Sequence, residues 1–471
     1  MDGPQPYSEY KDSRLLWLGR IPAHWEEKRG KYYFREVEER STTGDEPLLS
    51  VSHVTGVTRR KASVNMFMAE SNVGYKVCRS GDLVINTMWA WMAAMGVSRQ
   101  VGLVSPSYGV YRPRKGGLYS PEYLDHLLRS PPYASEYMCR SSGIRASRLR
   151  LYPDDFLDIP VVRPPLGEQE ALARYITRQD HMVHRFVRNR RRLIDLLNEQ
   201  KQAIITRTVT RGLNSDVTLK PSGIDWLGGI PRHWKVKPLK RWAAINRLVL
   251  PETTDPDYVF DYLDIGCVGT GILVDRPTRT RFGEAPSRAR RIVRCGDTII
   301  STVRTYLRAV YFVAEEANDL VASTGFAVLT PSAGVVPEFL GITLQSDPFV
   351  NCMTANSTGV GYPAITETQL GTFHVAMPPS LDEQQDIVKE VHKKTAALTT
   401  WIQRIQHQIK LIREYHVRLV ADVVTGKIDV RGLAPAEPSD AGEGVDRDTD
   451  DKGIPWEDDP ELVEGATDAD E

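Results

Sequence analysis

The chain has 471 residues, enough for two or three domains that each bury a core. Five cysteines without a CxxC spacing argue against a zinc site and fit a reducing, cytoplasmic compartment. No apolar run is long enough to span a membrane, and the polar, proline-containing first ten residues do not predict a secretory signal.

The formal net charge of −1 hides an asymmetry along the chain. Of 61 acidic and 60 basic residues, 15 acidic and 2 basic ones fall in residues 434–471, which leaves 46 acidic against 58 basic before them. We therefore expect a basic folded body and, over residues 428–471, an acidic tail without fixed structure. The basic body suggests a polyanion such as nucleic acid as partner, although a modest excess can also serve solubility alone.

The first half begins with a motif that recurs in the second half. Trp17–Trp25 reads WLGRIPAHW and Trp226–Trp234 reads WLGGIPRHW, with seven of nine positions identical. We interpret both copies as buried anchors that pin the start of each half onto a long helix, with His24 and His233 in structural roles. A binding motif is the alternative.

Short strands follow the anchor in both halves, in the same order. A Gly-Asp turn leads into a β-branched strand, GDLVIN at Gly81–Asn86 and GDTIIS at Gly296–Ser301. Strands closed by proline, SYGVYRP and GFAVLTP, and then helices, YLDHLLRS and FLGITLQS, come next. These patterns predict two globular domains of mixed strands and helices, at residues 1–165 and 212–380.

Each domain is followed by more than 40 residues without Pro or Gly, starting at Glu168 and Glu383. A double proline precedes each stretch and a glycine follows it, as helix boundaries require. We predict spacer helices within 166–211 and 381–427, each roughly 60 Å long. Both share one heptad register, which favours two helices packed on each other over two unrelated surface helices. The apolar seam residues are Ile176, Val183, Phe186, Leu197 and Ile204, and Val391, Leu398, Trp401, Ile412 and Leu419.

The short motifs that could indicate a catalytic site are explained better by structural roles or are missing from the sequence. SPPY at Ser130–Tyr133 resembles the base-holding motif of amino-methyltransferases, but its counterpart in the second half is SDPF. A serine followed by proline is typical of a helix cap and first turn. There is no GxxxxGK[ST] phosphate loop, and no carboxylate pair, triad or metal cluster recurs. We expect a chain without a catalytic site or a cofactor of its own.

Positions that differ between the halves are better functional candidates. After the Gly-Asp strand, the first half carries Trp89 and Trp91, whereas the second carries Arg304, Tyr306 and Arg308. Arginine can read guanine edges, and aromatic rings can pack on sugars, thymine methyls or unstacked bases. Nearby basic loops can bind phosphates or can be solvated surface charge. Their residues are Arg59, Arg60, Lys61, Arg145, Arg148, Arg279 and Arg281.

Over residues 14–432 the sequence resembles the specificity subunit of type I restriction-modification systems. The resemblance is carried by WLGRIPAHW and SGIDWLGGIPRHW, the Gly-Asp strands, the helix starts PPLGEQE and PPSLDEQQ, and the helix ends VTRGL and VTGKI. It implies an α/β (mixed α+β) fold with two tandem target-recognition domains separated by two long antiparallel helices in a pseudo-two-fold repeat.

The resemblance also implies partners. Double-stranded DNA is read as a bipartite site, and two copies of a modification subunit supply adenine methylation from S-adenosylmethionine. Restriction subunits with ATP-dependent translocase and nuclease activity can join, so ATP and Mg are expected there. Because the halves differ, we expect an asymmetric, interrupted target with half-site centres about 34 Å apart. The alternatives are a stand-alone methyltransferase or nuclease, or a DNA-binding scaffold without enzyme partners.

Overall fold

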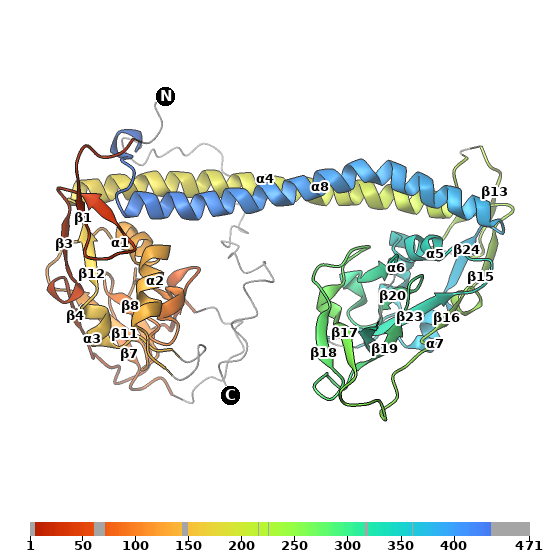
Figure 1. The fold of residues 1–471 in the computed structure, drawn as a ribbon, viewed down its shortest axis with the longest axis horizontal. Helices are drawn as coiled ribbons and strands as arrows, with labels where there is room; N and C mark the ends of the chain where they lie inside the picture. Colours follow the sequence, from red (N-terminus) through yellow and green to blue (C-terminus); the bar gives the residue numbers. More distant parts are fainter. Residues whose placement is uncertain are drawn as a thin grey trace. The chain divides into compact units, whose positions relative to one another are not determined.

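The computed structural model describes residues 5–60, 71–143, 149–214, 216–224, 226–315, 319–359 and 361–434. The chain forms two compact units (Figure 1). Unit 1 comprises Met1–Arg188 and Gln408–Glu471, and unit 2 comprises Asn189–His407. Each long helix therefore contributes to both units, so the units cut across the predicted spacer segments. In the ranges given above, no helix has the length and apolar character needed to cross a membrane.

Unit 1 is built on a four-stranded antiparallel sheet in the order β4-β11-β8-β9. The described part of the unit also contains four two-stranded ladders and three short α-helices. The sheet strands are β4 (Phe34–Glu36), β8 (Leu83–Ile85), β9 (Met95–Val97) and β11 (Gly109–Pro113). The ladders join β1 (Tyr10–Asp12) to β2 (Arg20–Pro22), β3 (Glu26–Arg29) to β12 (Pro160–Arg163), β5 (Leu49–Ser52) to β6 (Gly56–Arg59), and β7 (Lys76–Cys78) to β10 (Gly102–Val104). The helices are α1 (Pro121–Leu128), α2 (Pro131–Arg140) and α3 (Pro153–Leu157).

Unit 2 repeats this plan with the sheet β16-β23-β20-β21. It adds a second sheet, β18-β17-β22-β19, in which β17 and β22 are parallel. The strands are β16 (Ala243–Ile245), β17 (Val259–Leu263), β18 (Thr278–Arg281), β19 (Ala289–Val293), β20 (Thr298–Ser301), β21 (Val310–Phe312), β22 (Leu320–Ser323) and β23 (Phe326–Pro331). Ladders join β13 (Leu219–Pro221) to β14 (Gly229–Pro231) and β15 (Lys235–Pro238) to β24 (His374–Met377). The helices are α5 (Pro337–Leu344), α6 (Asp347–Ala355) and α7 (Glu367–Thr372). The mixed α/β class and the internal repeat predicted from the sequence are confirmed.

The Gly-Asp turns have the same conformation in both units. Gly81 and Gly296 have φ angles of 88° and 87°, a region that favours glycine. The following aspartates, Asp82 and Asp297, each accept a 2.8 Å hydrogen bond from a backbone N–H three residues earlier. This closed turn feeds β8 and β20 into the centre of each sheet, where both strands are buried.

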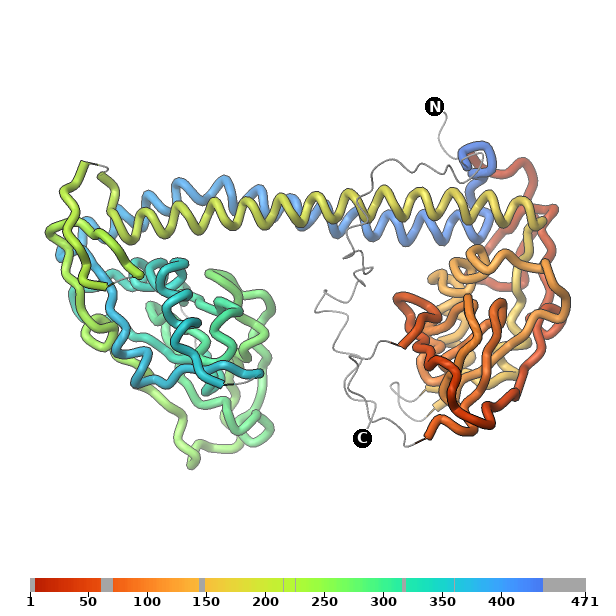
Figure 2. The backbone as a smooth tube through the Cα atoms, turned by 180° about the vertical axis from the view of Figure 1, so that it is seen from behind, coloured from red at the N-terminus to blue at the C-terminus, as the bar shows by residue number. Residues whose placement is uncertain are grey.

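The two long helices are α4 (Leu166–Arg211) and α8 (Leu381–Val424), and both are drawn without a break in Figure 2. Within unit 1, Leu172 near the start of α4 shares a core with Val423 near the end of α8. Within unit 2, Val209 near the end of α4 shares a core with Ile387 near the start of α8. The helix segments of each unit are thus antiparallel, as predicted.

The predicted seam uses two positions of each seven-residue repeat, three residues apart, and the structure corrects the second of them. In α8, Val391, Ile405 and Leu419 occupy the first position and are buried as predicted, and the residues four positions after each of them are also buried. The second buried position therefore lies four residues after the first, one residue later than predicted. Trp401, assigned to the seam, is 56% exposed.

In α4 the same shift puts Val187 in the stripe. Its neighbour Phe186, which was predicted for the seam, is only half-buried. Apolar residues stand at both alternatives, so periodicity alone does not choose between them, and packing selects the compact aliphatic side chains. Of the other predicted residues, Ile176 and Val183 are buried, and Leu197, Ile204, Leu398 and Ile412 are half-buried.

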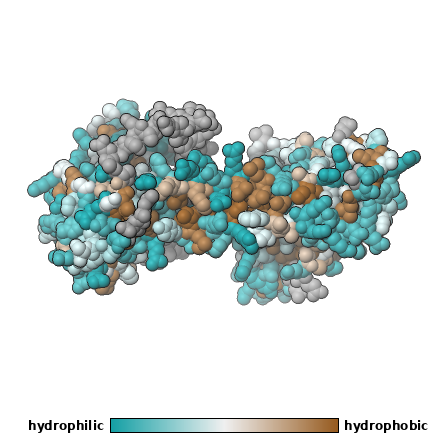
Figure 3. Space-filling model, turned by 90° about the horizontal axis from the view of Figure 1, so that it is seen from above, coloured by the Kyte–Doolittle hydropathy of each residue, from teal (hydrophilic) through white to brown (hydrophobic). Residues whose placement is uncertain are grey.

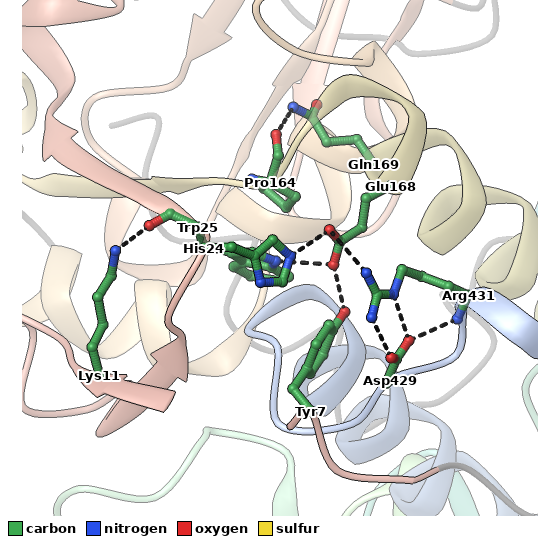
Figure 4. A network of polar contacts seen from close by, with 9 residues as sticks. All are labelled: Tyr7, Lys11, His24, Trp25, Pro164, Glu168, Gln169, Asp429 and Arg431. Atoms are coloured by element: carbon green, nitrogen blue, oxygen red, sulfur yellow. Dashed lines mark hydrogen bonds and ion pairs between the residues drawn. The ribbon is translucent and has the colours of Figure 1, made fainter. Parts of the chain in front are cut away.

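The tryptophan motif of unit 1 closes on the first turn of α4 (Figure 4). Buried Trp25 donates its indole N–H to Glu168 Oε1 at 3.0 Å, and His24 Nε2 lies 2.8 Å from Glu168 Oε2. Tyr7 donates its hydroxyl to the same carboxylate at 2.7 Å. Arg431, which follows α8, lies 3.9 Å from it and also pairs with Asp429 at 2.6 Å. Four segments of unit 1 therefore meet at one carboxylate.

Unit 2 repeats the anchor with fewer partners. Trp234 Nε1 donates to Glu383 Oε1 at 2.9 Å, and His233 Nε2 lies 2.9 Å from the same carboxylate. The residue after each glutamate also acts alike, because Gln169 and Gln384 donate to the carbonyls of Pro164 and Pro378 at 2.8 and 3.0 Å. The anchor interpretation is confirmed for the second tryptophan of each motif. Trp17, the first tryptophan of its copy, is 51% exposed instead and donates to Glu136 at 3.0 Å.

Candidate nucleic-acid interface

The turn that follows the Gly-Asp strand has the same build in both units. It contains a 3-10 helix, η2 (Ala90–Met92) in unit 1 and η6 (Thr305–Leu307) in unit 2. Each 3-10 helix ends at a left-handed residue, Ala93 with φ 58° and Arg308 with φ 58°. A backbone N–H that comes later in the chain closes each turn with a 2.9 Å hydrogen bond, from Leu151 to the Thr87 carbonyl and from Ile365 to the Thr302 carbonyl. The same scaffold thus carries different side chains.

In unit 1 the turn presents tryptophan and methionine side chains. Trp89 precedes η2 and Trp91 lies within it, and both are half-buried. The Trp91 indole N–H donates to the Met88 carbonyl at 3.1 Å, and the Met88 side chain is exposed. This turn offers aromatic and thioether surface without a charge.

In unit 2 the turn presents arginine and exposed apolar side chains. Arg304 precedes η6 in a left-handed conformation, with φ 51° and ψ 50°. Tyr306 and Leu307 are about half exposed. Arg308 is committed to an ion pair, because its guanidinium lies 2.5 Å from Asp347 Oδ1. The two arginines of this turn are therefore in different electrostatic environments.

The other predicted basic residues lie apart from these turns in the chain. Arg59 ends β6 and is exposed, and Arg60 follows it, half-buried. Arg279 and Arg281 lie on the edge strand β18, where each faces an aspartate, Asp261 at 3.2 Å and Asp257 at 3.8 Å. These pairs reduce the charge available for a phosphate. Lys61, Arg145 and Arg148 lie outside the described residues, as do residues 435–471 of the predicted acidic tail.

The structure adds a residue that sequence reasoning missed. The Tyr362 ring is 64% exposed, and the Arg304 Cζ lies 4.4 Å from its centroid. An aromatic residue between a glycine and a proline, in the sequence GYP, was the available signal for an exposed tyrosine. Its pairing with Arg304 could not be read from the sequence because the two residues are far apart in the chain.

The SPPY stretch is part of the fold of unit 1. Ser130 stands at the N-cap of α2, and its counterpart Ser346 stands at the N-cap of α6. The prediction of a helix cap is correct for the position of each serine, but neither hydroxyl accepts a capping hydrogen bond from the helix backbone. Each hydroxyl instead donates backward, to the Leu127 carbonyl at 2.6 Å and to the Thr343 carbonyl at 2.7 Å, so the serine joins two consecutive helices. Tyr133 is buried, and burial raises the pKa of its hydroxyl. The residues of the SPPY stretch therefore have structural roles in unit 1.

The sequence and the structure of the chain were compared with those of known proteins. No protein-family model matches the chain. The type I restriction enzyme HindI specificity subunit of Haemophilus influenzae is 29% identical over 131 residues. That match covers 27% of this chain and 28% of the relative, well under two thirds of the relative's length.

Solved structures match over a larger share of the chain. A structure on complex assembly and conformational transition of the type I R-M system contains a chain with a TM-score of 0.55 at 18% identity. The alignment covers 86% of this chain and 98% of that chain. The HsdS subunit from Thermoanaerobacter tengcongensis aligns over 86% of this chain with 18% identity and a TM-score of 0.39. Over part of its sequence the chain is similar to the HindI specificity subunit, and over most of its length it is similar in fold to a chain of the type I R-M system structure.

Proposed function

We propose that this chain is the DNA-recognition subunit of a type I restriction-modification complex, with no catalytic site of its own. The observation that carries the proposal is the turn after the Gly-Asp strand. The two units share the 3-10 helix of this turn, its left-handed end and its closing hydrogen bond, but present Trp89 and Trp91 in one case and Arg304 and Tyr306 in the other. A scaffold that is kept while its side chains differ is suited to reading two different half-sites.

The target is then asymmetric and interrupted. Each unit reads one half-site, and because the side chains differ, the two half-sites differ in sequence. The basic body of the chain, 58 basic against 46 acidic residues before the acidic tail, supports a polyanion as the ligand. Bases between the half-sites are unread, and the gap has a constant length.

Exposed apolar side chains on the long helices support protein partners. On the segments in unit 1, Met182, Leu411, Tyr415 and Val417 are exposed, and on those in unit 2, Leu193, Leu196 and Trp401. Figure 3 shows hydrophobic residues, in brown, among hydrophilic ones on one face of the molecule. Large apolar side chains on a surface mark sites of interaction. Each unit therefore binds one copy of a modification subunit, and S-adenosylmethionine is bound by that subunit. ATP and Mg belong to restriction subunits where these join, and the complex acts in the cytoplasm.

Mapping methylated adenines in the genomes of cells with and without this gene tests the proposal. The expected result is an interrupted, asymmetric motif that is methylated only when the gene is present. A continuous motif, a perfect palindrome, or a gap of freely varying length contradicts the proposal.

The alternative functions need a biochemical test. The purified chain alone is expected neither to transfer methyl groups from S-adenosylmethionine nor to cleave DNA, whereas the chain purified with its modification subunit methylates the target. Methyl transfer by the chain alone favours a stand-alone methyltransferase. DNA binding without co-purification of a methyltransferase favours a scaffold.

A further inference from the structure

The turn around η6 holds two residues in a backbone conformation that side chains rarely adopt. Arg304 and Arg308 flank the 3-10 helix, with φ angles of 51° and 58°. Non-glycine residues in the left-handed region persist where surrounding contacts impose it, and such positions cluster at ligand-binding sites. For Arg304, the contacts that impose it come from a later segment of the same unit.

That segment is Tyr362–Ala364. The Arg304 N–H donates to the Pro363 carbonyl at 2.7 Å, and Val303 forms a β-bridge with Ala364. One residue further along, the Thr305 and Ser357 hydroxyl oxygens are 2.8 Å apart. The backbone of Arg304 is thus held on both sides, which sets the direction in which its side chain leaves the turn.

The guanidinium of Arg304 is also held, but it is not neutralised. Its Cζ lies 4.4 Å from the centroid of the Tyr362 ring, a cation–π contact. Arg308, Arg279 and Arg281 each face an aspartate at 2.5–3.8 Å. Among the salt bridges of the described residues, none involves Arg304. Stacking uses the face of the guanidinium and leaves its N–H edge for a ligand.

The surroundings favour a base edge over a phosphate. Tyr306 and Leu307 are exposed beside Arg304, and apolar side chains suit thymine methyls and base edges. A planar arginine fork matches the O6 and N7 acceptors of guanine in the major groove, and a fork fixed in advance loses less freedom on binding.

We propose that Arg304, oriented by Tyr362, reads a guanine in the half-site bound by unit 2. This rests on the proposed function and names the base that one unit recognises. Unit 1 lacks this device, because Trp89 occupies the position that Arg304 occupies in unit 2, with φ −119°. A guanine preference set by this arginine–tyrosine pair therefore belongs to the half-site of unit 2 only.

The test compares variants of the full chain expressed with its modification subunit, by genome-wide mapping of methylated adenines. Arg304→Lys keeps the charge and removes the fork, so at one position of one half-site the preference for guanine should fall by roughly tenfold or more. Tyr362→Leu removes the stacking surface and should relax the same position. Tyr362→Phe keeps the ring and should retain the wild-type motif. Trp89→Ala is the matched change in unit 1 and should alter the other half-site.

Several outcomes overturn the inference while leaving the proposed function intact. These are a wild-type motif in the Arg304→Lys variant, a change confined to the other half-site, or a unit 2 half-site without a G·C pair. If the guanine position of the motif is relaxed in Tyr362→Phe as well as in Tyr362→Leu, stacking on the ring is not what orients Arg304. Co-purification of each variant with the modification subunit distinguishes lost reading from lost folding. If no motif depends on the gene at all, the proposed function fails instead.

Discussion

The indole N–H of Trp25 donates a 3.0 Å hydrogen bond to Glu168, and the equivalent bond from Trp234 to Glu383 measures 2.9 Å. The two carboxylates differ in their environment. The Glu168 side chain is 5% exposed and also accepts from Tyr7, whereas the Glu383 side chain is 28% exposed. Glu168 and Glu383 therefore occupy equivalent places in the repeat but are expected to contribute unequally to the free energy of unfolding.

Replacing these glutamates should show the inequality. Glu168→Ala leaves the buried Trp25 and Tyr7 donors without an acceptor, and should lower the free energy of unfolding by about 3 kcal/mol. Glu383→Ala should cost less, about 1–2 kcal/mol, because it leaves one buried donor, the Trp234 indole, without an acceptor rather than two. Urea unfolding of the purified variants measures the difference. Equal losses would show that the additional contacts of Glu168 contribute nothing.

The glycines that follow the long helices offer a matched pair. Gly426 and Gly212 have φ angles of 76° and 73°, so alanine is strained at both by about 1 kcal/mol. A Cβ on Gly426 would also come within 2.9 Å of Trp25, whereas one on Gly212 would lie 3.5 Å from Trp234. Gly426→Ala should therefore destabilise by about 2 kcal/mol more than Gly212→Ala. A thermal melt in which Gly212→Ala is the less stable variant would contradict this.

His126 should make the stability of unit 1 depend on pH. The pKa of His126 is lowered from 6.5 to about 4, mainly by burial, with the charge of Asp180 raising it and those of Arg129, His416 and Arg99 lowering it. Between these values the unfolded chain binds a proton that the folded chain does not. Stability is therefore fully present above pH 6.5 and falls as the pH drops toward 4, by at most about 3 kcal/mol.

Replacing His126 tests this linkage. His126→Gln should flatten the pH dependence of the free energy of unfolding between pH 6.5 and 5, which lies above the ordinary pKa values of Asp and Glu. The measurement is urea unfolding at a series of pH values, with the wild-type chain as the control. An unchanged slope in the variant would assign the dependence to another group.

The two faces of α8 should respond differently to a charge. Ile405 is buried in the helix stripe, so Ile405→Asp should destabilise unit 2 by about 3–5 kcal/mol. Trp401 is 56% exposed, so Trp401→Asp should leave the unfolding curve nearly unchanged. If this face docks the modification subunit, Trp401→Asp should still weaken the complex on a sizing column. Normal assembly of that variant would move the docking surface elsewhere.

The sequence by itself determined the repeat, the fold class and both ends of α4, and it placed the start of α8 correctly and its end three residues too late. These features are encoded locally. A double proline and a glutamate start α4 and α8, a glycine with positive φ ends each, and Gly81 and Gly296 form the turns before β8 and β20. Such signals act over a few residues, so they can be read without knowing what lies opposite.

Only the tertiary structure decided which side chains meet. It buries Trp25 and leaves Trp17 exposed, selects Ile402 rather than Trp401 for the inward side of α8, and pairs Arg308 with Asp347. It also places Tyr362 against Arg304. Each outcome depends on a partner distant in the chain, and on the fit of volumes and charges in a close-packed environment, which residue type and periodicity do not specify.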